Sequence, residues 1–251
     1  MLDQERGIVV VTGASRGIGA SISLDLARNG FHVACLSRSG EIPSTVNEAD
    51  ELRDRISAFR CDITNEASVV EALSAVSKWS TQRIVGLVNN AGLHLQGPSA
   101  AFPIGDFDRV MRTNATSVLL VSQAAYPYLQ GAENALIVNI GSFFDKLGVK
   151  GNAAYCASKA AVGAITRCLA VEWARDGIRV MNVAPGYIET DLNRDELNDT
   201  SLGAYLKKRI PTGGPGEVSD ISKLVSMLFH SPQPYLTGET LYIDGGQGIV
   251  L

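Results

Sequence analysis

The stretch Thr12-Gly13-Ala14-Ser15-Arg16-Gly17-Ile18-Gly19 decides the fold of this chain, because it joins an apolar run to a segment of helical period. Glycines at such a junction permit a tight turn and the close approach of a pyrophosphate to the backbone. The start of the following helix would offer free N–H groups and partial positive charge to the same phosphates. The alternative is three glycines that only ease a packed strand–helix junction. The context of strand, glycine turn and helix favours a dinucleotide-binding turn.

Short apolar runs rich in Val and Ile alternate with segments of helical period along the rest of the chain. We expect strands at 7–12, 32–37, 58–61, 84–89, 135–140, 179–184 and 240–243. We expect helices at 17–29, 44–55, 65–79, 104–129, 152–175 and 217–230, with a glycine C-cap at Gly177. Strands that are apolar throughout suit a parallel sheet buried on both faces. The pattern predicts an α/β fold, a doubly wound parallel seven-stranded sheet with helices on both faces.

The composition of the 251 residues is that of an ordinary globular protein, with 45% hydrophobic and 19% charged residues. We expect one domain, 1–251, because no repeat, low-complexity tract or linker interrupts it. The net charge of −4 argues against nucleic-acid binding. We find no apolar signal segment and no long apolar run, so we expect a soluble, cytoplasmic protein without membrane association.

The four cysteines, Cys35, Cys61, Cys156 and Cys168, form no CxxC pair. In a cytosolic chain we expect them to be reduced, mostly buried and neither bridged nor metal-bound. The sequence therefore predicts no metal site.

The segment 189–215 breaks the alternation of strands and helices. It is polar and mixed in charge, and it ends in Pro211-Thr212-Gly213-Gly214-Pro215. Such an insertion after a strand is either a mobile substrate lid or a long surface loop. Its position favours the lid.

The end of the second strand, Leu36-Ser37-Arg38, indicates which dinucleotide would bind. Sites for NAD(H) usually place an acidic residue there to hold the ribose 2′-hydroxyl. That acid is absent, and the guanidinium of Arg38 can bind a 2′-phosphate that a carboxylate would repel. Arg16 in the first turn would add a second cation. NADP(H) is therefore favoured over NAD(H), the alternative for Arg38 being a solvated arginine at a strand end.

Tyr155 and Lys159 lie four residues apart, and Ser142 lies thirteen residues upstream. On a helix, positions i and i+4 share one face, so the ammonium would stand beside the phenol and favour the phenolate. Bringing a tyrosine from a pKa of ~10 to near 7 takes ~4 kcal/mol. A close ammonium together with a cofactor charge would supply that in a partly dry site. Taken alone, the pair is also compatible with two surface residues on a helix.

These features together make the chain resemble the short-chain dehydrogenase/reductase family, whose members have a Rossmann-like fold. The likeness covers nearly the whole chain. The motifs that carry it are the turn 12–19, Asp62, Asn89-Asn90-Ala91-Gly92, Asn114, Ser142, Tyr155-x-x-x-Lys159, Pro185-Gly186 and Ile243-Asp244-Gly245-Gly246.

The resemblance implies a catalytic set of four residues. Tyr155 would be the general acid in ketone reduction and the base in alcohol oxidation. Ser142 would hydrogen-bond the substrate oxygen, and Lys159 would bind the nicotinamide ribose and lower the tyrosine pKa. Asn114 would hold a water that links the lysine to a proton relay. The alternatives are a strand-end cap for Ser142 and a helix-breaking hydrogen bonder for Asn114.

The resemblance also implies the cofactor contacts. Asp62 would contact the adenine, unless it is the N-cap of the following helix. The full set of implied cofactor residues is Gly13, Ser15, Arg16, Gly17, Ile18, Gly19, Ser37, Arg38, Asp62, Ile63, Asn90, Ala91, Gly92, Tyr155, Lys159, Pro185, Gly186, Ile188 and Thr190.

The substrate walls would come from the segment 93–96, the lid and five further side chains. These are His94, Phe143, Phe144, Asn152 and Tyr187. Phe143 and Phe144 suggest an apolar or aromatic ketone, or else core packing of at least one ring. His94 would bind a polar substrate group or simply face the solvent.

Within the family the chain looks most like the 3-oxoacyl-carrier-protein reductases. Where those enzymes present basic residues to their acidic carrier, this chain has Glu133 and Asp176, which disfavours an acyl carrier protein as a partner. Arg175, adjacent to Asp176, would compensate in part, and Lys207, Lys208 and Arg209 would form a local basic patch. Family members usually form tetramers, so we expect a homotetramer.

The favoured function is an NADPH-dependent carbonyl reductase that also works as an alcohol dehydrogenase. The first alternative is a 3-oxoacyl thioester reductase of fatty-acid or polyketide synthesis. An alternative from another class of function is a non-catalytic NADP(H) sensor or a partner-dependent subunit. Sensors of that kind usually lack the tyrosine or the lysine, and this chain has both Tyr155 and Lys159.

Overall fold

The computed structural model of the protein describes residues 6–43, 50–190 and 200–250. Its main sheet has seven parallel strands in the order β3-β2-β1-β4-β5-β6-β9, which confirms the predicted doubly wound sheet. The strands are β1 (Ile8–Thr12), β2 (His32–Ser37), β3 (Ile56–Arg60), β4 (Ile84–Asn89), β5 (Leu136–Ile140), β6 (Arg179–Pro185) and β9 (Thr240–Ile243).

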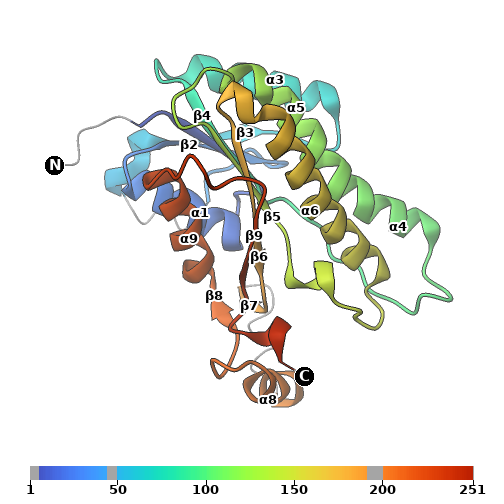
Figure 1. Ribbon diagram of the computed structural model, residues 1–251. Helices are drawn as coiled ribbons and strands as arrows, with labels where there is room; N and C mark the ends of the chain where they lie inside the picture. The colour runs from blue at the N-terminus through green and yellow to red at the C-terminus, as the bar shows by residue number, and fades with distance from the viewer. Residues whose placement is uncertain (1–5, 44–49, 191–199, 251) are drawn as a thin grey trace.

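Helices cover both faces of the sheet (Figure 1). One face carries α1 (Gly17–Arg28) and α9 (Val218–His230), and the other carries α3 (Glu66–Trp79), α5 (Ser117–Leu129) and α6 (Ala153–Trp173). Side chains of β1 alternate between the two cores: Val9 and Val11 pack with Phe229 of α9, whereas Ile8 and Val10 pack with Leu73 of α3. Burying each such side chain stabilises the fold by about 1.5–3 kcal/mol.

The strand order reverses between β1 and β4, where a doubly wound sheet opens a crevice beyond its carboxyl ends. Hydrogen bonds tie the two strand ends together. The Thr12 hydroxyl accepts from the backbone N–H groups of Asn90 (3.0 Å) and Ala91 (3.1 Å). The Asn90 amide donates to the carbonyls of Thr12 (3.0 Å) and Gly13 (3.1 Å). The glycine-rich turn is thereby fixed against the loop that follows β4.

Three buried asparagines stand side by side on adjacent strands: Asn89 on β4, Asn139 on β5 and Asn182 on β6. Asn89 donates to the Asn139 oxygen at 2.9 Å, and Asn139 donates to the Thr166 hydroxyl of α6 at 2.9 Å. Buried amides of this kind are costly unless paired. Through Asn139 the row therefore holds α6, which carries Tyr155 and Lys159, in a fixed position on the sheet.

The predicted element boundaries hold within a few residues, with three differences. The strand expected at 58–61 begins earlier, at Ile56. Of the helix expected at 44–55, residues 44–49 lie outside the described residues, and the rest is a 3-10 turn, η1 (Asp50–Arg55). The helix expected at 104–129 is divided into α4 (Ile104–Met111), a π-helical turn η2 (Arg112–Thr116) and α5.

After α6 the chain makes a 3-10 turn, η4 (Ala174–Asp176). Gly177 then adopts the left-handed conformation (φ 77°), as expected for a glycine that ends a helix. Two further 3-10 turns are η3 (Phe143–Lys146) and η5 (Gln247–Ile249).

The segment 189–215 begins and ends at a small parallel ladder that the sequence did not predict. Here β7 (Ile188–Glu189) pairs with β8 (Gly216–Glu217). The described part of the segment contains α8 (Thr200–Arg209), which projects below the sheet (Figure 1). Residues 191–199 lie outside the described residues, so movement of a lid stays a prediction.

Of the four cysteines, Cys35 and Cys61 are buried, Cys156 is half-buried and Cys168 is exposed. All four are free thiols, and the expectation that most would be buried is met by only two. Among the described residues, no helix combines the length and apolarity needed to cross a membrane.

Candidate active site

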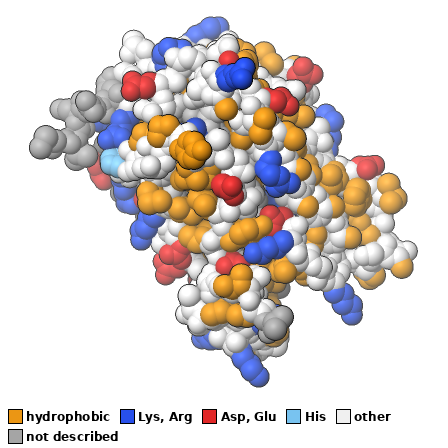
Figure 2. Space-filling view, in the orientation of Figure 1, with side chains coloured by type: hydrophobic (Ala, Val, Ile, Leu, Met, Phe, Trp, Pro, Cys, Tyr) orange, Lys and Arg blue, Asp and Glu red, His pale blue; other side chains and the backbone are white. Residues whose placement is uncertain are grey.

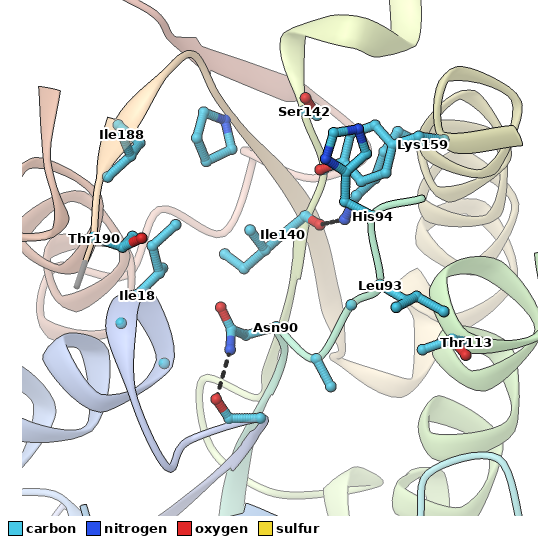
Figure 3. Close-up of a pocket in the computed structure, with 18 of the residues that line it drawn as sticks. Ile18, Asn90, Leu93, His94, Thr113, Ile140, Ser142, Lys159, Ile188 and Thr190 are labelled. Atoms are coloured by element: carbon cyan, nitrogen blue, oxygen red, sulfur yellow. Dashed lines mark hydrogen bonds between the residues drawn. The ribbon is translucent and has the colours of Figure 1, made fainter. Parts of the chain in front are cut away.

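A cleft of about 1260 Å³ runs along the carboxyl ends of the central strands. The nineteen predicted cofactor residues and the five named substrate side chains all line this cleft, and so does Ser142. Of the predicted wall 93–96, Leu95 does not line it, and the described part of the lid contributes Thr190 and Leu202. Figure 3 shows Ile18, Ile188 and Thr190 on one side of it and Leu93, His94 and Lys159 on the other. Asn114, alone of the four predicted catalytic residues, does not line the cleft.

The glycine-rich turn leaves no room for a side chain at Gly13 or at Gly19. A Cβ on Gly13 would lie 2.8 Å from the Ala91 Cα, and a Cβ on Gly19 would collide with the Gly13 carbonyl. Gly13 and Gly17 also have positive φ angles, 64° and 57°. Arg16 precedes α1 without making a side-chain cap, so the first N–H groups of the helix stay available. Gly17, Ile18 and Gly19 line the cleft at the start of this helix, where a bound pyrophosphate would meet their N–H groups.

Ser37 and Arg38 lie where the second strand ends, and the exposed side chains of Arg16 and Arg38 line the same end of the cleft. The Asp62 carboxylate accepts hydrogen bonds from the backbone N–H (2.9 Å) and the hydroxyl (2.7 Å) of Thr64. These bonds, with smaller contributions from Arg38 and Arg112, lower the pKa of Asp62. The cap of α3 is Asn65, so the interpretation of Asp62 as the N-cap is wrong.

Sequence reasoning missed Arg109, Arg112 and Thr113, which also line the cleft. Arg112 donates to the Thr64 carbonyl at 2.7 Å and thereby fixes the loop that carries Asp62. Arg112 and Thr113 follow Arg109 by three and four residues, a spacing that places all three side chains on one face of a helix. This spacing was the only sign in the sequence that they belong together. No motif marked that face as functional.

Ser142 and Tyr155 form the polar centre of the cleft. Ser142 is the N-cap of η3, and its hydroxyl accepts a hydrogen bond from the Phe144 N–H at 3.3 Å. Burial raises the pKa of Tyr155 to about 12, and the neighbouring Ser142 hydroxyl offsets only part of that rise. A carbonyl oxygen placed between the two hydroxyls would meet two hydrogen-bond donors.

Lys159 is 5% exposed and donates from Nζ to the Ile140 carbonyl at 2.8 Å. Burial lowers the pKa of this lysine to about 8. Its Nζ lies 5.6 Å from the centre of the Tyr155 ring. The protein's own groups hold the pKa of the Tyr155 phenol above its ordinary value. Lowering that pKa to near 7 would therefore require the positive charge of a bound cofactor.

Asn114 sits in the π-helical turn and is buried behind the cleft. Its side chain accepts from the Leu93 N–H (2.7 Å) and donates to the Leu93 carbonyl (2.8 Å) and the Ser158 hydroxyl (3.0 Å). Single π-helical turns often mark functional sites. In this position Asn114 joins the loop after β4 to the helix that carries Tyr155.

Aromatic rings form the wall beside Tyr155. The rings of Phe143 and Phe144 lie 4.8 Å apart, and each also contacts Tyr187. Phe144 meets Tyr155 edge to face at 5.9 Å. Phe143 and Phe144 are only 3% and 8% exposed, so they serve the core as well as the cleft.

His94 is exposed in the cleft, and its ring lies 4.7 Å from that of Tyr155. The Asn152 amide donates from Nδ2 to the Lys150 carbonyl, so its oxygen must be the partner of His94 Nε2. His94 therefore carries a hydrogen on Nε2. It is held in place rather than simply solvated.

Comparison with known proteins agrees with this architecture. A family model described as short chain dehydrogenase matches residues 7–201. Gluconate 5-dehydrogenase of Gluconobacter oxydans is 32% identical over 240 residues, covering 94% of this chain and 93% of that protein. The 3-oxoacyl-[acyl-carrier-protein] reductase of Homo sapiens is 34% identical over 244 residues, covering 97% and 99%.

A solved structure extends the comparison. The gluconate 5-dehydrogenase of Burkholderia cenocepacia, in complex with NADP and tartrate, aligns with a TM-score of 0.90 and 30% identity, covering 99% of this chain and 97% of that one. Because the family model and these relatives span nearly all of the cleft and the sheet, the chain belongs to the short-chain dehydrogenase family, whose members are oxidoreductases that use a nicotinamide cofactor.

Proposed function

We propose that this protein reversibly reduces a ketone to a secondary alcohol with NADPH as the hydride donor. The observation that carries the proposal is that the hydroxyls of Ser142 and Tyr155 line the same cleft as the glycine-rich turn. A reduction needs a proton donor and a second donor where negative charge develops on the oxygen. The two hydroxyls meet that need.

In this mechanism Ser142 donates a hydrogen bond to the substrate oxygen and orients the carbonyl. The Tyr155 hydroxyl delivers the proton to the same oxygen. Lys159, held by the Ile140 carbonyl, contributes a positive charge beside the phenol that favours loss of the proton. When bound, the nicotinamide supplies the hydride in reduction and accepts it in oxidation. Asn114 keeps the loop after β4 and α6 in register through Leu93 and Ser158.

The preference for NADP(H) over NAD(H) rests on the end of β2. Arg38 and Arg16 line the cleft there, and the strand ends without an acidic residue. Two guanidinium groups would hold a 2′-phosphate with charge-assisted hydrogen bonds. The gluconate 5-dehydrogenase of Burkholderia cenocepacia, which was solved with NADP, has the same fold.

A second candidate is a 3-oxoacyl thioester reductase. It is favoured by the 34% identity to the human 3-oxoacyl-[acyl-carrier-protein] reductase and by the exposed Lys207 and Lys208 at the end of α8. Against an acyl carrier, Glu133 is exposed, and Asp176 accepts a hydrogen bond from the Tyr126 hydroxyl at 3.0 Å. A coenzyme A thioester would escape that charge conflict.

We also propose a homotetramer in the cytoplasm. The outer face of α6 exposes small or apolar residues, including Ala157, Ala164, Cys168 and Val171, which is 81% exposed. The charged Arg167 and Glu172 are also exposed on α6. Figure 2 shows hydrophobic side chains on this side of the molecule, with charged ones among them. A second copy covering this face would remove apolar surface from water. Sedimentation at micromolar concentration tests the assembly, and a clean monomer rejects it.

The test of function follows the loss of NADPH absorbance, with NADH in parallel, against alkyl ketones, aryl ketones, quinones and a 3-oxoacyl thioester. We expect turnover of at least one carbonyl class, faster with NADPH than with NADH. Tight NADPH binding without turnover of any class would instead point to a sensor or a partner-dependent subunit.

A further inference from the structure

Beside the cleft lies a second hollow of about 930 Å³, between the segments 96–100 and 147–151. Its walls are the backbones of three glycines and mostly apolar side chains, among them Pro98, Leu147, Val149 and Ala153. None of the residues assigned above to catalysis or cofactor binding lines it. Such a surface attracts aliphatic groups, because their transfer out of water is favourable.

The hollow and the cleft adjoin each other. Gln96 lines both of them. On α6, Tyr155 lines the cleft and the next residue, Cys156, lines the hollow. At the start of the same helix, Asn152 lines the cleft and Ala153 lines the hollow. A molecule whose carbonyl meets Tyr155 would therefore have the hollow within reach of its far end.

We propose that the hollow is a distal substrate subsite that takes the unbranched aliphatic tail of the ketone reduced at Tyr155. The inference rests on the proposed function and deepens it by naming long-chain aliphatic ketones as the substrate class. The hollow is open to solvent, so a bound tail would stay partly exposed to water. Each added methylene should then raise kcat/KM about twofold.

Two glycines make a matched test. A Cβ on Gly148, in the wall of the hollow, would have no heavy atom within 4 Å, and the same holds for Gly105 of α4, which lines neither cavity. The experiment measures kcat/KM with NADPH for methyl ketones whose alkyl chain grows one methylene at a time. We expect a rise with chain length in the wild type and in Gly105→Leu, and a flattened rise in Gly148→Leu. A wild-type profile without chain-length dependence, or a rise that survives in Gly148→Leu, would overturn the subsite.

A second measurement needs neither turnover nor a folded Gly148→Leu variant. Cys156 is half-buried in the hollow, whereas burial raises the pKa of Cys35 and Cys61 to about 11, which should make those two thiols react more slowly. In a Cys168→Ser background, iodoacetamide labelling read by mass spectrometry reports on Cys156. We expect a long methyl ketone to slow this labelling and a short one to leave it unchanged.

The two measurements separate the two proposals. Protection of Cys156 by the long ketone in a protein that reduces no ketone would keep the subsite and reject the proposed function. Turnover of short ketones with equal labelling rates for both chain lengths would reject the subsite and keep the function.

Discussion

The Lys159 ammonium is 2.8 Å from the Ile140 carbonyl oxygen and 5.6 Å from the centre of the Tyr155 ring. The lysine is therefore anchored to the last residue of β5, which lies two residues before Ser142. Because the same carbonyl leads into the loop that carries Ser142, the lysine and the serine are positioned by one short piece of backbone.

Stability should depend on pH through Lys159. Burial lowers its pKa from 10.5 to about 8, so between these values the unfolded chain binds more protons than the folded one. The free energy of unfolding therefore rises with pH in that window, by roughly 3 kcal/mol. Urea unfolding of the wild type and of Lys159→Met at pH 8, 9 and 10 isolates the effect, since the variant lacks it. Parallel pH curves for the two proteins would contradict the prediction.

Replacing Tyr155 by Phe should lower kcat by about 10²–10⁴-fold, because the variant keeps the ring and loses the proton donor. NADPH binding, followed by fluorescence, should change little. Tyr235, fully exposed on the surface, provides the control, and Tyr235→Phe should retain wild-type turnover. Retained turnover in Tyr155→Phe would reject the assigned role.

Arg38→Asp should reverse the cofactor preference. The change removes a guanidinium from the 2′-phosphate and introduces a carboxylate that repels it, which should raise the Kd for NADPH by about 10–100-fold. The Kd for NADH should stay the same or fall. Arg175, exposed at the end of α6, receives the same charge change as a control. Equal losses for NADPH and NADH would show that Arg38 acts on the fold and not on the phosphate.

Gly19→Ala should impair both folding and cofactor binding, because its methyl group would collide with the Gly13 carbonyl and the Asn90 amide. Overpacking of this kind typically costs about 1–3 kcal/mol. Gly105→Ala, with open space around its Cβ, should be neutral or stabilising by up to about 1 kcal/mol. Thermal unfolding and NADPH titration of both variants measure the contrast. Equal melting temperatures would refute it.

Most of the sheet and of the cofactor cleft could be predicted because their signals are local. The apolar run of β1 and the glycines at 13, 17 and 19 fix a strand, a turn and a helix within a few residues. Tyr155 and Lys159 share a helical face by spacing alone. The family resemblance then placed residues as distant as Asp62 and Thr190 in one cleft.

Pairings between distant segments could not be predicted in the same way. His94 and Asn152 are 58 residues apart, and only the fold brings their side chains together. The contact of Arg112 could not be predicted, because the side chain donates to the backbone carbonyl of Thr64 and every residue has such a carbonyl. The expected pKa of Tyr155 also depended on burial, which raises it and which spacing does not reveal.

The π-helical turn at Arg112–Thr116 has a consequence for insertions and deletions. A π-turn contains one residue more than an α-helical turn, and each residue of an α-helix rotates the side chains by about 100°. Deleting Thr113 would let α4 and α5 join into a regular helix while turning one of them relative to the other. Asn114 would then leave Leu93 and Ser158, although Ser142, Tyr155 and Lys159 would keep their identity and their places on β5 and α6. The position of Asn114 relative to Leu93 and Ser158 therefore depends on the number of residues in this turn. An insertion or deletion there would disturb the site more than most substitutions would.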